Sequence, residues 1–285
     1  MNPIERRALR AFLAEDLGAQ GDVTSRTLLS PRHRITALLV ANDAGIVAGL
    51  PYVAALFRLV DRRARVRLLA REGSAVRRGQ RIAYVRGPAL AILAAERTAL
   101  NLLGHLSGIA TLTRQFTARV RGTRAAIYDT RKTLPGLRSF EKYAVRIGGG
   151  RNHRMSLSDQ LLIKTNHLRI LGGLRAPSAR RALIAACRAR HGLVEVEVTD
   201  AEELLLALLA HADIILLDNM PPSAIRRAVR LRHLLRPTTR LEVSGGVTLT
   251  NIRAIAQTGV DRISVGALTK SASSLDFALR VRSSG

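Results

Sequence analysis

Predicted strands and helices alternate through the second half of this chain, and this alternation constrains the fold more than any other feature. Short runs rich in Val, Ile and Leu, each the length of a buried strand, alternate with amphipathic segments of helical length. The predicted strands are 125–130, 160–164, 193–198, 213–217, 240–243 and 261–265. The predicted helices between them include 178–190, 201–210, 222–235 and 250–258. This alternation predicts an α/β fold with a parallel sheet, either closed as a barrel or open.

The first half of the chain follows a different pattern and predicts a separate layer. Helices are expected at 4–17 and 51–60, strands at 34–41, 44–48 and 65–70, and a loop at 21–24. Short strands and glycine turns over 72–85 are typical of biotinyl and lipoyl carrier domains, but a carrier needs a lysine and none precedes residue 132. We therefore interpret them as a small structural β-layer. A helix is expected at 88–106, broken by Gly108 and followed by another at 109–120.

The chain is strongly basic, with 46 basic against 21 acidic residues and a net charge of +25. A field of this sign would attract a polyanion such as nucleic acid. The arginines are scattered through predicted helices, however, and the 3% of aromatic residues give no stacking platform. A compositional bias toward Arg and Ala is the favoured explanation, and we expect no nucleic-acid partner. All the other basic residues are arginines, so the lysines are candidates for sites that need a compact ammonium group. The lysines are Lys132, Lys142, Lys164 and Lys270.

Cysteine usage and hydropathy indicate the compartment. The single cysteine, Cys187, permits no intrachain disulfide, which suits a reducing cytoplasm. The N-terminus has no continuous apolar stretch of the signal-peptide type, and no 18-residue stretch is free of charge. We therefore expect a cytoplasmic protein that does not span a membrane.

Almost every predicted strand of the second half ends in polar residues. Ligands bind at the carboxyl ends of parallel strands in α/β proteins, so this recurrence along one rim predicts an active face. The two late glycine-containing ends precede helices, which is the expected place for a phosphate held by backbone N–H groups. Any one of these ends alone would equally fit an ordinary surface loop. They are Asp129-Thr130-Arg131-Lys132, Lys164-Thr165-Asn166-His167, Glu195 with Glu197, Asp218-Asn219, Ser244-Gly245-Gly246 and Gly266-Ala267.

Two regions of the second half indicate anion binding. The planar guanidinium of Arg131 beside the ammonium of Lys132 suits a ligand that carries carboxylate and phosphate groups. His153 and Arg154 follow three glycines, and with no second histidine at helical spacing and no nearby cysteine, anion recognition is favoured there over zinc. The sequence has no Gly-x-Gly-x-x-Gly after a strand and no Walker A motif, which excludes Rossmann and P-loop sites.

The order of these motifs resembles quinolinate phosphoribosyltransferase, a family also called carboxylating nicotinate-nucleotide pyrophosphorylase. The resemblance covers nearly the whole chain, and so many ordered motifs make it specific. The matching motifs are Glu15-Asp16-Leu17-Gly18, Gly21-Asp22-Val23-Thr24, residues 96–101, 106–111 and 129–136, Lys142-Tyr143-Ala144-Val145, Gly148-Gly149-Gly150, Asn152-His153-Arg154, Ile163-Lys164 with Asn166-His167, residues 194–198 and 216–220, Ser244-Gly245-Gly246 and residues 265–269.

The resemblance implies a fold in two parts and a specific reaction. An N-terminal α/β sandwich over 1–112, joined by residues 271–285, would accompany an incomplete α/β barrel over 113–270 that carries catalysis, as in type II phosphoribosyltransferases. The family implies a homodimer, or a higher oligomer built from it, in which the partner subunit completes each active site. The implied reaction converts quinolinate and phosphoribosyl pyrophosphate into nicotinate mononucleotide, pyrophosphate and carbon dioxide, with Mg²⁺, in de novo NAD biosynthesis.

The resemblance also implies which residues act. Lys132, Glu197 and Asp218 are the expected catalytic residues: Lys132 would neutralise the pyrophosphate leaving group, while the two carboxylates would stabilise the oxocarbenium-like sugar and hold ribose hydroxyls and Mg²⁺. The expected ligands of the quinolinate carboxylates are Arg131, His153, Arg154 and Lys164, with Arg97 reaching in from the other subunit. The expected 5′-phosphate site is Ser244, Gly245, Gly246, Gly266 and Ala267.

Two positions depart from the family pattern. Thr165 stands where the family usually has Asp or Glu, and Lys270 where it usually has His, and either change bears on phosphate or metal binding. A molybdenum-associated paralogous family shares the fold, but Lys164, Asn166 and His167 favour the quinolinate enzyme. The alternative is a related phosphoribosyltransferase that keeps the phosphate site and acts on a different pyridine or pyrrole carboxylate.

Overall fold

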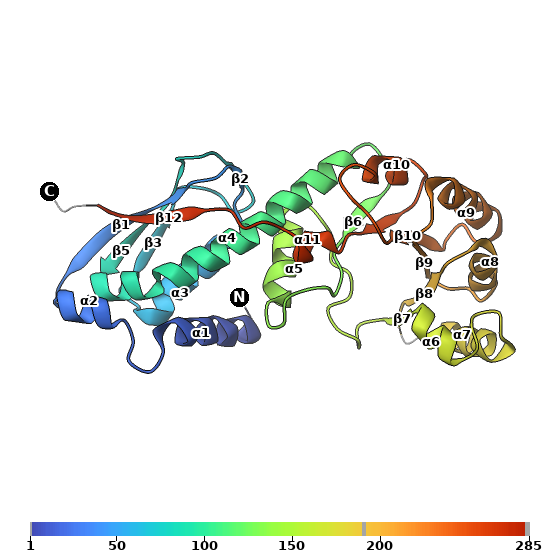
Figure 1. Cartoon of the computed structure of the whole chain (residues 1–285), viewed down its shortest axis with the longest axis horizontal. Coiled ribbons are helices and arrows are strands. Elements are labelled where there is room, and N and C mark those ends of the chain that lie inside the picture. The colour runs from blue at the N-terminus through green and yellow to red at the C-terminus, as the bar shows by residue number, and fades with distance from the viewer. Residues whose placement is uncertain (1, 190–191, 283–285) are drawn as a thin grey trace. The chain divides into compact units, whose positions relative to one another are not determined.

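The computed structural model describes residues 2–189 and 192–282, and their contacts divide the chain into two compact units (Figure 1). Unit 1 comprises Met1–Arg114, Thr133–Gly149 and Ser271–Gly285, and unit 2 comprises Gln115–Lys132 and Gly150–Lys270. Residue 1 and residues 283–285 of the expected sandwich, and Arg190 at the end of the helix predicted at 178–190, lie outside the described residues.

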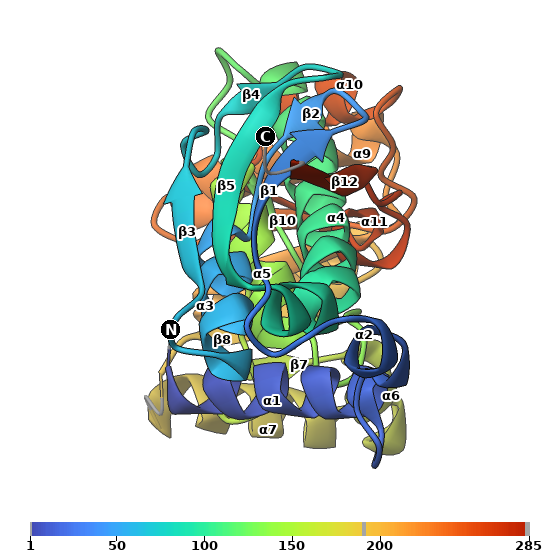
Figure 2. The ribbon, with the colours of Figure 1, turned by 90° about the vertical axis from the view of Figure 1, so that its left-hand side faces the viewer.

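Unit 1 is built on an antiparallel sheet of four strands in the order β12-β1-β5-β3. These strands span Phe277–Arg282, Arg34–Ala41, Arg81–Pro88 and Arg65–Leu68, and a small second sheet pairs β2 (Gly45–Ile46) with β4 (Ala75–Val76). Figure 2 shows β3, β5, β1 and β12 in succession across the four-stranded sheet. The helices of this unit include α1 (Pro3–Leu17), α2 (Val23–Leu28) and α3 (Leu50–Val60). Buried Leu39, Leu56 and Phe57 belong to the apolar core of this unit.

A single helix, α4 (Ala89–Arg119), replaces the two helices predicted over this region, so the expected break at Gly108 is wrong. A side chain at Gly108 would clash with the carbonyl oxygen of Ser273, and a Cβ at Gly104 would lie 2.5 Å from that of Leu275. Leu275 also donates its amide to the carbonyl of Gly104 at 3.1 Å. The glycines therefore let the C-terminal segment lie directly against the helix.

Two further segments differ from the prediction. The expected loop at 21–24 leads into α2, because Asp22 caps that helix by accepting a hydrogen bond from the Ser25 amide. Residues 133–149, expected within the barrel segment 113–270, cluster with unit 1. They include α5 (Arg138–Ile147), whose Phe140 packs its ring 4.9 Å from that of Tyr52. Aromatic packing accounts for this assignment, since Phe140 is completely buried.

Unit 2 contains a parallel sheet of six strands in the order β6-β11-β10-β9-β8-β7, as expected for an incomplete α/β barrel. Its strands span Ala126–Tyr128, Arg262–Ser264, Arg240–Ser244, Ile214–Asp218, Val194–Val198 and Leu161–Ile163. Its helices are α6 (Thr165–Ile170), α7 (Pro177–Ala189), α8 (Ala201–Leu209), α9 (Pro222–Leu235), α10 (Ile252–Ala256) and α11 (Ala267–Lys270). All six predicted strands are present, shortened or extended by a residue or two at their ends.

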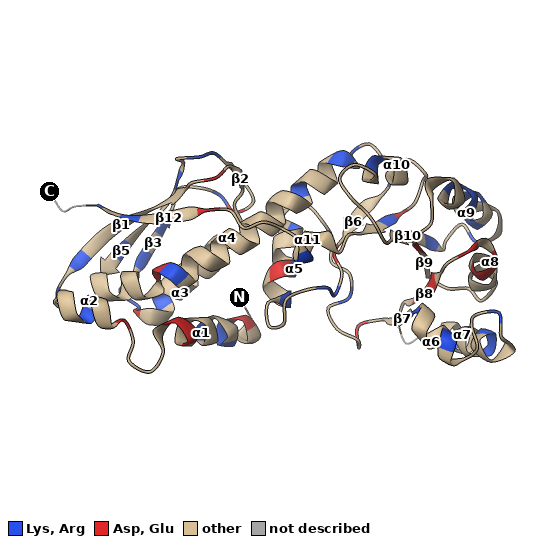
Figure 3. Cartoon of the chain, in the orientation of Figure 1, with Lys and Arg blue, Asp and Glu red and all other residues tan. Residues whose placement is uncertain are grey.

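The structure shows where the basic residues lie and whether a described helix could span a membrane. Figure 3 shows Lys and Arg distributed over helices and strands of both units instead of gathered in one segment. Among the helices of residues 2–189 and 192–282, none combines the length and the hydrophobicity needed to cross a bilayer.

Candidate active site

Polar side chains of neighbouring strands share one face of the unit 2 sheet near the carboxyl ends of the strands. In the register of β8 and β9, Glu197 lies beside Leu216, and Asp218 lies two residues farther along. Ser244 lies beside Asp218 in the register of β10 and β9. Residues two apart on a strand face the same way, so this face carries Glu197, Asp218 and Ser244 together.

The carboxylate of Glu197 is bound by the segment that follows β7. Its Oε1 accepts two hydrogen bonds from Thr165, one from the backbone amide at 3.1 Å and one from the hydroxyl at 2.5 Å. Its Oε2 lies 3.9 Å from Nζ of Lys164. The structure thus brings Lys164 and Glu197, both predicted site residues, to the same point of the rim.

The turn after β10 is shaped around Asn219. Asn219 has φ 54°, and Gly245 and Gly246 have φ 90° and 58°, values that favour glycine or asparagine. Asn219 donates its amide to the carbonyl of Ser244 at 2.9 Å and its side chain to Asp218 at 2.9 Å. A side chain at Gly245 would collide with Asn219. Sequence reasoning did not assign Asn219 a role, although it follows Asp218 directly.

Lys132 lies beside the glycine turn after β11. A Cβ at Gly266 would lie 3.2 Å from Cδ of Lys132, and the Thr269 hydroxyl donates to the Lys132 carbonyl at 2.7 Å. The Lys132 amide in turn donates to the Thr130 hydroxyl at 3.0 Å. The exposed ammonium group of Lys132 therefore lies close to the backbone of Gly266, where Ala267 opens α11.

Arg131 and Arg154 are close enough to influence each other electrostatically. Burial lowers the pKa of Arg154, and the positive charge of Arg131 lowers it further. Arg154 is half-buried and donates to the carbonyl of Gln160 at 3.2 Å. Two guanidinium groups near each other in a partly buried place favour an anion between or beside them.

Asp129 holds the segment that carries His153 and Arg154. Its carboxylate is fully buried and accepts from the side chain of Asn152 at 2.5 Å and from the amide of His153 at 2.8 Å. The first strand end of the sheet thereby fixes the backbone that presents Arg154.

His153 is buried among carboxylates that sequence reasoning did not connect to it. Its Nε2 lies 3.1 Å from Glu195 and 3.5 Å from Glu242, and its Nδ1 accepts a hydrogen bond from the Arg154 amide at 2.8 Å. Burial lowers the pKa of His153, but the hydrogen bonds and charges of the two carboxylates outweigh it and raise that pKa to about 9. The Arg154 amide opposes this rise, because it needs a lone pair on Nδ1.

A buried ionic network continues from His153 across the sheet. Glu242 Oε2 lies 2.6 Å from Nε of Arg262 in an ion pair, and Ser264 donates its hydroxyl to Glu242. The Arg262 guanidinium also lies 4.0 Å from the centre of the Tyr128 ring. Burial raises the pKa of Glu242, but the hydrogen bond from His153 and the charge of Arg262 outweigh it, so the pKa is lowered.

This network bears on metal binding at His153. Ligand atoms of His153, Glu195 and Glu242 lie within 4.8 Å of one another, a spacing that a metal ion would accept. Arg262 already supplies a positive charge to Glu242, and Nε2 of His153 faces both carboxylates and carries a proton that a metal ion would have to displace. The hydrogen bonds of His153 and the Arg262 ion pair thus already engage the ligand atoms, so we interpret the cluster as an internal polar network.

Arg97 belongs to unit 1, whereas the other predicted site residues belong to unit 2. It is exposed on α4, next to the half-buried Glu96. Burial raises the pKa of Glu96, and the charge of Arg97 opposes that rise. The role of Arg97 at the active site of a partner subunit stays a prediction.

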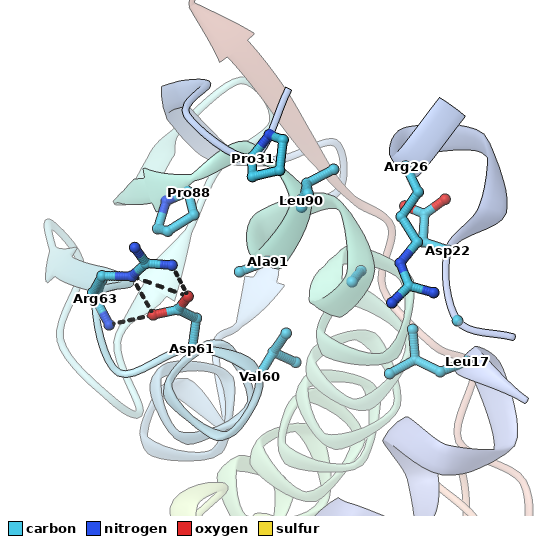
Figure 4. Close-up of a pocket in the computed structure, with 12 residues that line it drawn as sticks. Leu17, Asp22, Arg26, Pro31, Val60, Asp61, Arg63, Pro88, Leu90 and Ala91 are labelled. Carbon is cyan, nitrogen blue, oxygen red and sulfur yellow. Dashed lines mark hydrogen bonds and ion pairs between the residues drawn. The ribbon is translucent and has the colours of Figure 1, made fainter. Parts of the chain in front are cut away.

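A surface pocket of about 340 Å³ is lined by residues of unit 1, and none of the predicted site residues belongs to its lining (Figure 4). Arg63 pairs there with Asp61 at 2.7 Å, and Arg26 donates to the carbonyl of Gln20 at 2.8 Å. Much of the remaining lining is apolar, including Val60 and Leu90. Both arginines are thus already engaged, and we assign the pocket no part in the site.

Comparison with known proteins agrees with this arrangement. The family model of the quinolinate phosphoribosyl transferase N-terminal domain matches residues 22–107, and that of the C-terminal domain matches residues 109–280. The chain belongs to the quinolinate phosphoribosyltransferase family. The nicotinate-nucleotide pyrophosphorylase [carboxylating] of Mycobacterium leprae (strain TN) is 42% identical over 276 residues, covering 96% of each chain.

Other members of the quinolinate phosphoribosyltransferase family are similarly close. The probable nicotinate-nucleotide pyrophosphorylase [carboxylating] of Bacillus subtilis (strain 168) is 40% identical over 282 residues, which cover 99% of this chain and 95% of the relative. The solved structure of the nicotinate-nucleotide pyrophosphorylase from Francisella tularensis superposes with a TM-score of 0.90 at 39% identity, covering 99% of this chain and 97% of the other. The predicted resemblance to the family, and with it the fold class, is confirmed.

Proposed function

We propose that this enzyme transfers phosphoribosyl from phosphoribosyl pyrophosphate to quinolinate with decarboxylation, giving nicotinate mononucleotide, pyrophosphate and carbon dioxide in de novo NAD biosynthesis. The observation that carries the proposal is a single rim of unit 2 on which paired arginines, paired carboxylates and glycine turns occur together. Membership of the quinolinate phosphoribosyltransferase family supports the same reaction.

Quinolinate is a pyridine with two carboxylates, and a cationic clamp suits it. Arg131, Arg154 and Lys164 would bind these carboxylates, because guanidinium and ammonium groups form the strongest hydrogen bonds to anions. His153 contributes through Arg154, since its two ring nitrogens already contact Glu195, Glu242 and the Arg154 amide. The clamp would neutralise the substrate and orient its ring nitrogen toward the sugar.

The phosphoribosyl half of the site needs two kinds of group: donors for its phosphates and carboxylates for its sugar. Backbone N–H groups of the glycine turns would hold the 5′-phosphate, and Lys132 would neutralise the departing pyrophosphate. Glu197 and Asp218 would accept hydrogen bonds from the ribose hydroxyls and stabilise the positive charge that develops on the sugar. The 5′-phosphate ligands in this proposal are Ser244, Gly245, Gly246, Gly266 and Ala267.

The carboxylates fit a Mg²⁺ ion. Mg²⁺ prefers oxygen ligands and is usually held by one or two carboxylates together with substrate phosphates. Thr165 engages Oε1 of Glu197, which leaves Oε2 and the Asp218 carboxylate as ligands beside the pyrophosphate of the substrate. Bound there, Mg²⁺ would neutralise part of the pyrophosphate charge.

We further propose a homodimer, or a higher oligomer built from it, in which Arg97 completes the clamp of the partner subunit. An arginine on the exposed face of α4 is available for such a contact. We also propose that the enzyme works in a reducing cytoplasm, because its one cysteine permits no intrachain disulfide.

Substrate discrimination tests this proposal. Quinolinate and nicotinate should be compared at equal concentrations with phosphoribosyl pyrophosphate and Mg²⁺, following nicotinate mononucleotide by chromatography. The clamp of Arg131 and Arg154 predicts a strong preference for the dicarboxylate. Equal turnover of nicotinate would favour the alternative, a related phosphoribosyltransferase for a different pyridine or pyrrole carboxylate.

A further inference from the structure

We propose that Thr165 is a positioning residue that occupies one oxygen of Glu197 and reserves the other for the phosphoribosyl substrate and its metal ion. This inference rests on the proposed function, in which Glu197 contacts ribose and Mg²⁺. Thr165 is one of the two positions that depart from the family pattern, and the structure gives it a partner 32 residues away in sequence.

The geometry of the pair is specific. Thr165 is the first residue of α6, and its amide and hydroxyl both donate to the same atom, Oε1 of Glu197, at 3.1 and 2.5 Å. The other oxygen, Oε2, lies 3.9 Å from the half-exposed ammonium group of Lys164. Glu197 is therefore held by one oxygen and presents the other to the cationic, open side of the rim.

The Thr165 hydroxyl prevents a metal ion from binding both oxygens of Glu197. A carboxylate oxygen that already accepts two hydrogen bonds has little capacity left for a cation. A divalent ion can then approach Glu197 only through Oε2 and cannot chelate both oxygens. Metal binding to the free enzyme should be weak for this reason, and the ion should enter together with the pyrophosphate of the substrate. A carboxylate at position 165 would instead place a second anion beside Glu197.

Two substitutions separate the hydroxyl from the rest of the side chain. Thr165→Val keeps the branched shape and the amide donor but removes the hydroxyl, and Thr165→Ser keeps the hydroxyl. Thr199→Val is a matched control, because Thr199 also donates through its amide and its hydroxyl to one glutamate oxygen, Oε2 of Glu203, at 2.8 and 2.9 Å. Thr199 has no part in the proposed site.

The first readout is kinetic. For Thr165→Val, kcat/KM for phosphoribosyl pyrophosphate should fall about tenfold, the effect of one charge-assisted hydrogen bond. The affinity for quinolinate, measured by calorimetry, should change less than about threefold, and Thr165→Ser should restore most of the loss. A loss that Thr165→Ser does not restore, or that Thr199→Val reproduces, would overturn the proposal.

The second readout needs no activity. Mn²⁺ binding to the free enzyme, followed by electron paramagnetic resonance, should tighten about three- to tenfold in Thr165→Val, because Oε1 loses a donor. The gain should vanish in the Thr165→Val, Glu197→Gln double variant. Unchanged Mn²⁺ affinity in a folded Thr165→Val enzyme overturns the proposal. Because this measurement uses neither quinolinate nor turnover, it remains decisive if the proposed reaction itself fails.

Discussion

Replacing Glu242 by glutamine tests the buried ionic network beneath the site. The Glu242 side chain is fully buried, and its carboxylate contacts Arg262 at 2.6 Å, His153 at 3.5 Å and the Ser264 hydroxyl. Glutamine has the same shape and no charge, so Arg262, itself only 7% exposed in its side chain, would lose its counter-ion. Removing one partner of a buried ion pair costs about 3–5 kcal/mol, because the remaining charge stays buried.

That cost corresponds to a measurable fall in melting temperature. At an unfolding entropy of about 2.1 cal/mol/K per residue, 285 residues unfolding together give a fall of about 5–8 °C. Scanning fluorimetry at fixed protein concentration measures it. Glu202→Gln is the matched control, because Glu202 pairs with Arg175 at 2.5 Å with its side chain 62% exposed. Exposed pairs contribute about 0–1 kcal/mol, so that variant should melt within about 2 °C of the wild type.

A double variant separates the lost pair from lost packing. Glu242→Met with Arg262→Met removes both charges, and replacing a buried pair by apolar groups is often neutral. The double variant should therefore be more stable than the sum of the two single losses predicts. If Glu242→Gln melts no lower than Glu202→Gln, or if the double loss equals the sum, Glu242 and Arg262 are not coupled as the structure indicates.

Three further predictions concern the site. Arg131→Ala should weaken quinolinate binding about tenfold or more, since a hydrogen bond to a charged group contributes about 1.5–3 kcal/mol; unchanged affinity in calorimetry would remove Arg131 from the clamp. The pKa of His153, about 9 against an ordinary 6.5, should contribute up to about 3 kcal/mol of stability. This contribution is complete below about pH 6.5 and is lost as pH rises through about 9, so the wild type should lose more melting temperature between pH 7 and 10 than His153→Gln does; equal losses would contradict the shift. Arg97→Ala and Lys132→Ala subunits, each inactive alone, should recover roughly half of the wild-type activity per heterodimer, because one site carries both defects and the other neither; no recovery in a confirmed heterodimer would show that Arg97 serves its own subunit.

The parallel sheet could be predicted because its strands are buried on both faces and therefore appear as continuous apolar runs. Ile214–Asp218 is of this kind, whereas Val194–Val198 alternates valine with glutamate, and the polar residues at the strand ends indicated the rim. The break at Gly108 could not be judged from the sequence, because the segment that needs the glycine lies more than 160 residues later, at Ser273. A glycine within a helical stretch can either end the helix or allow another segment to pack closely against it, and the sequence alone does not distinguish these two roles.

The contacts that the site residues make could not be predicted from the sequence either. Thr165 was recognised as unusual, yet its contact with Glu197 depends on the register of β7 beside β8. Glu242 lies in the middle of a strand and gives no motif, and only the fold brings it to His153 and Arg262. Sequence patterns predict which residues end a strand, whereas the order and register of the strands in the folded sheet determine which of these residues are in contact.

The stoichiometry of the reaction tests the central claim most directly. Quinolinate labelled in the carboxyl group that is lost should be incubated with phosphoribosyl pyrophosphate and Mg²⁺, and carbon dioxide, pyrophosphate and nicotinate mononucleotide should be measured together. We expect the three products in equal amounts, with no carbon dioxide released when phosphoribosyl pyrophosphate is omitted. Pyrophosphate released without carbon dioxide, or no consumption of quinolinate by folded enzyme, would contradict the proposed function.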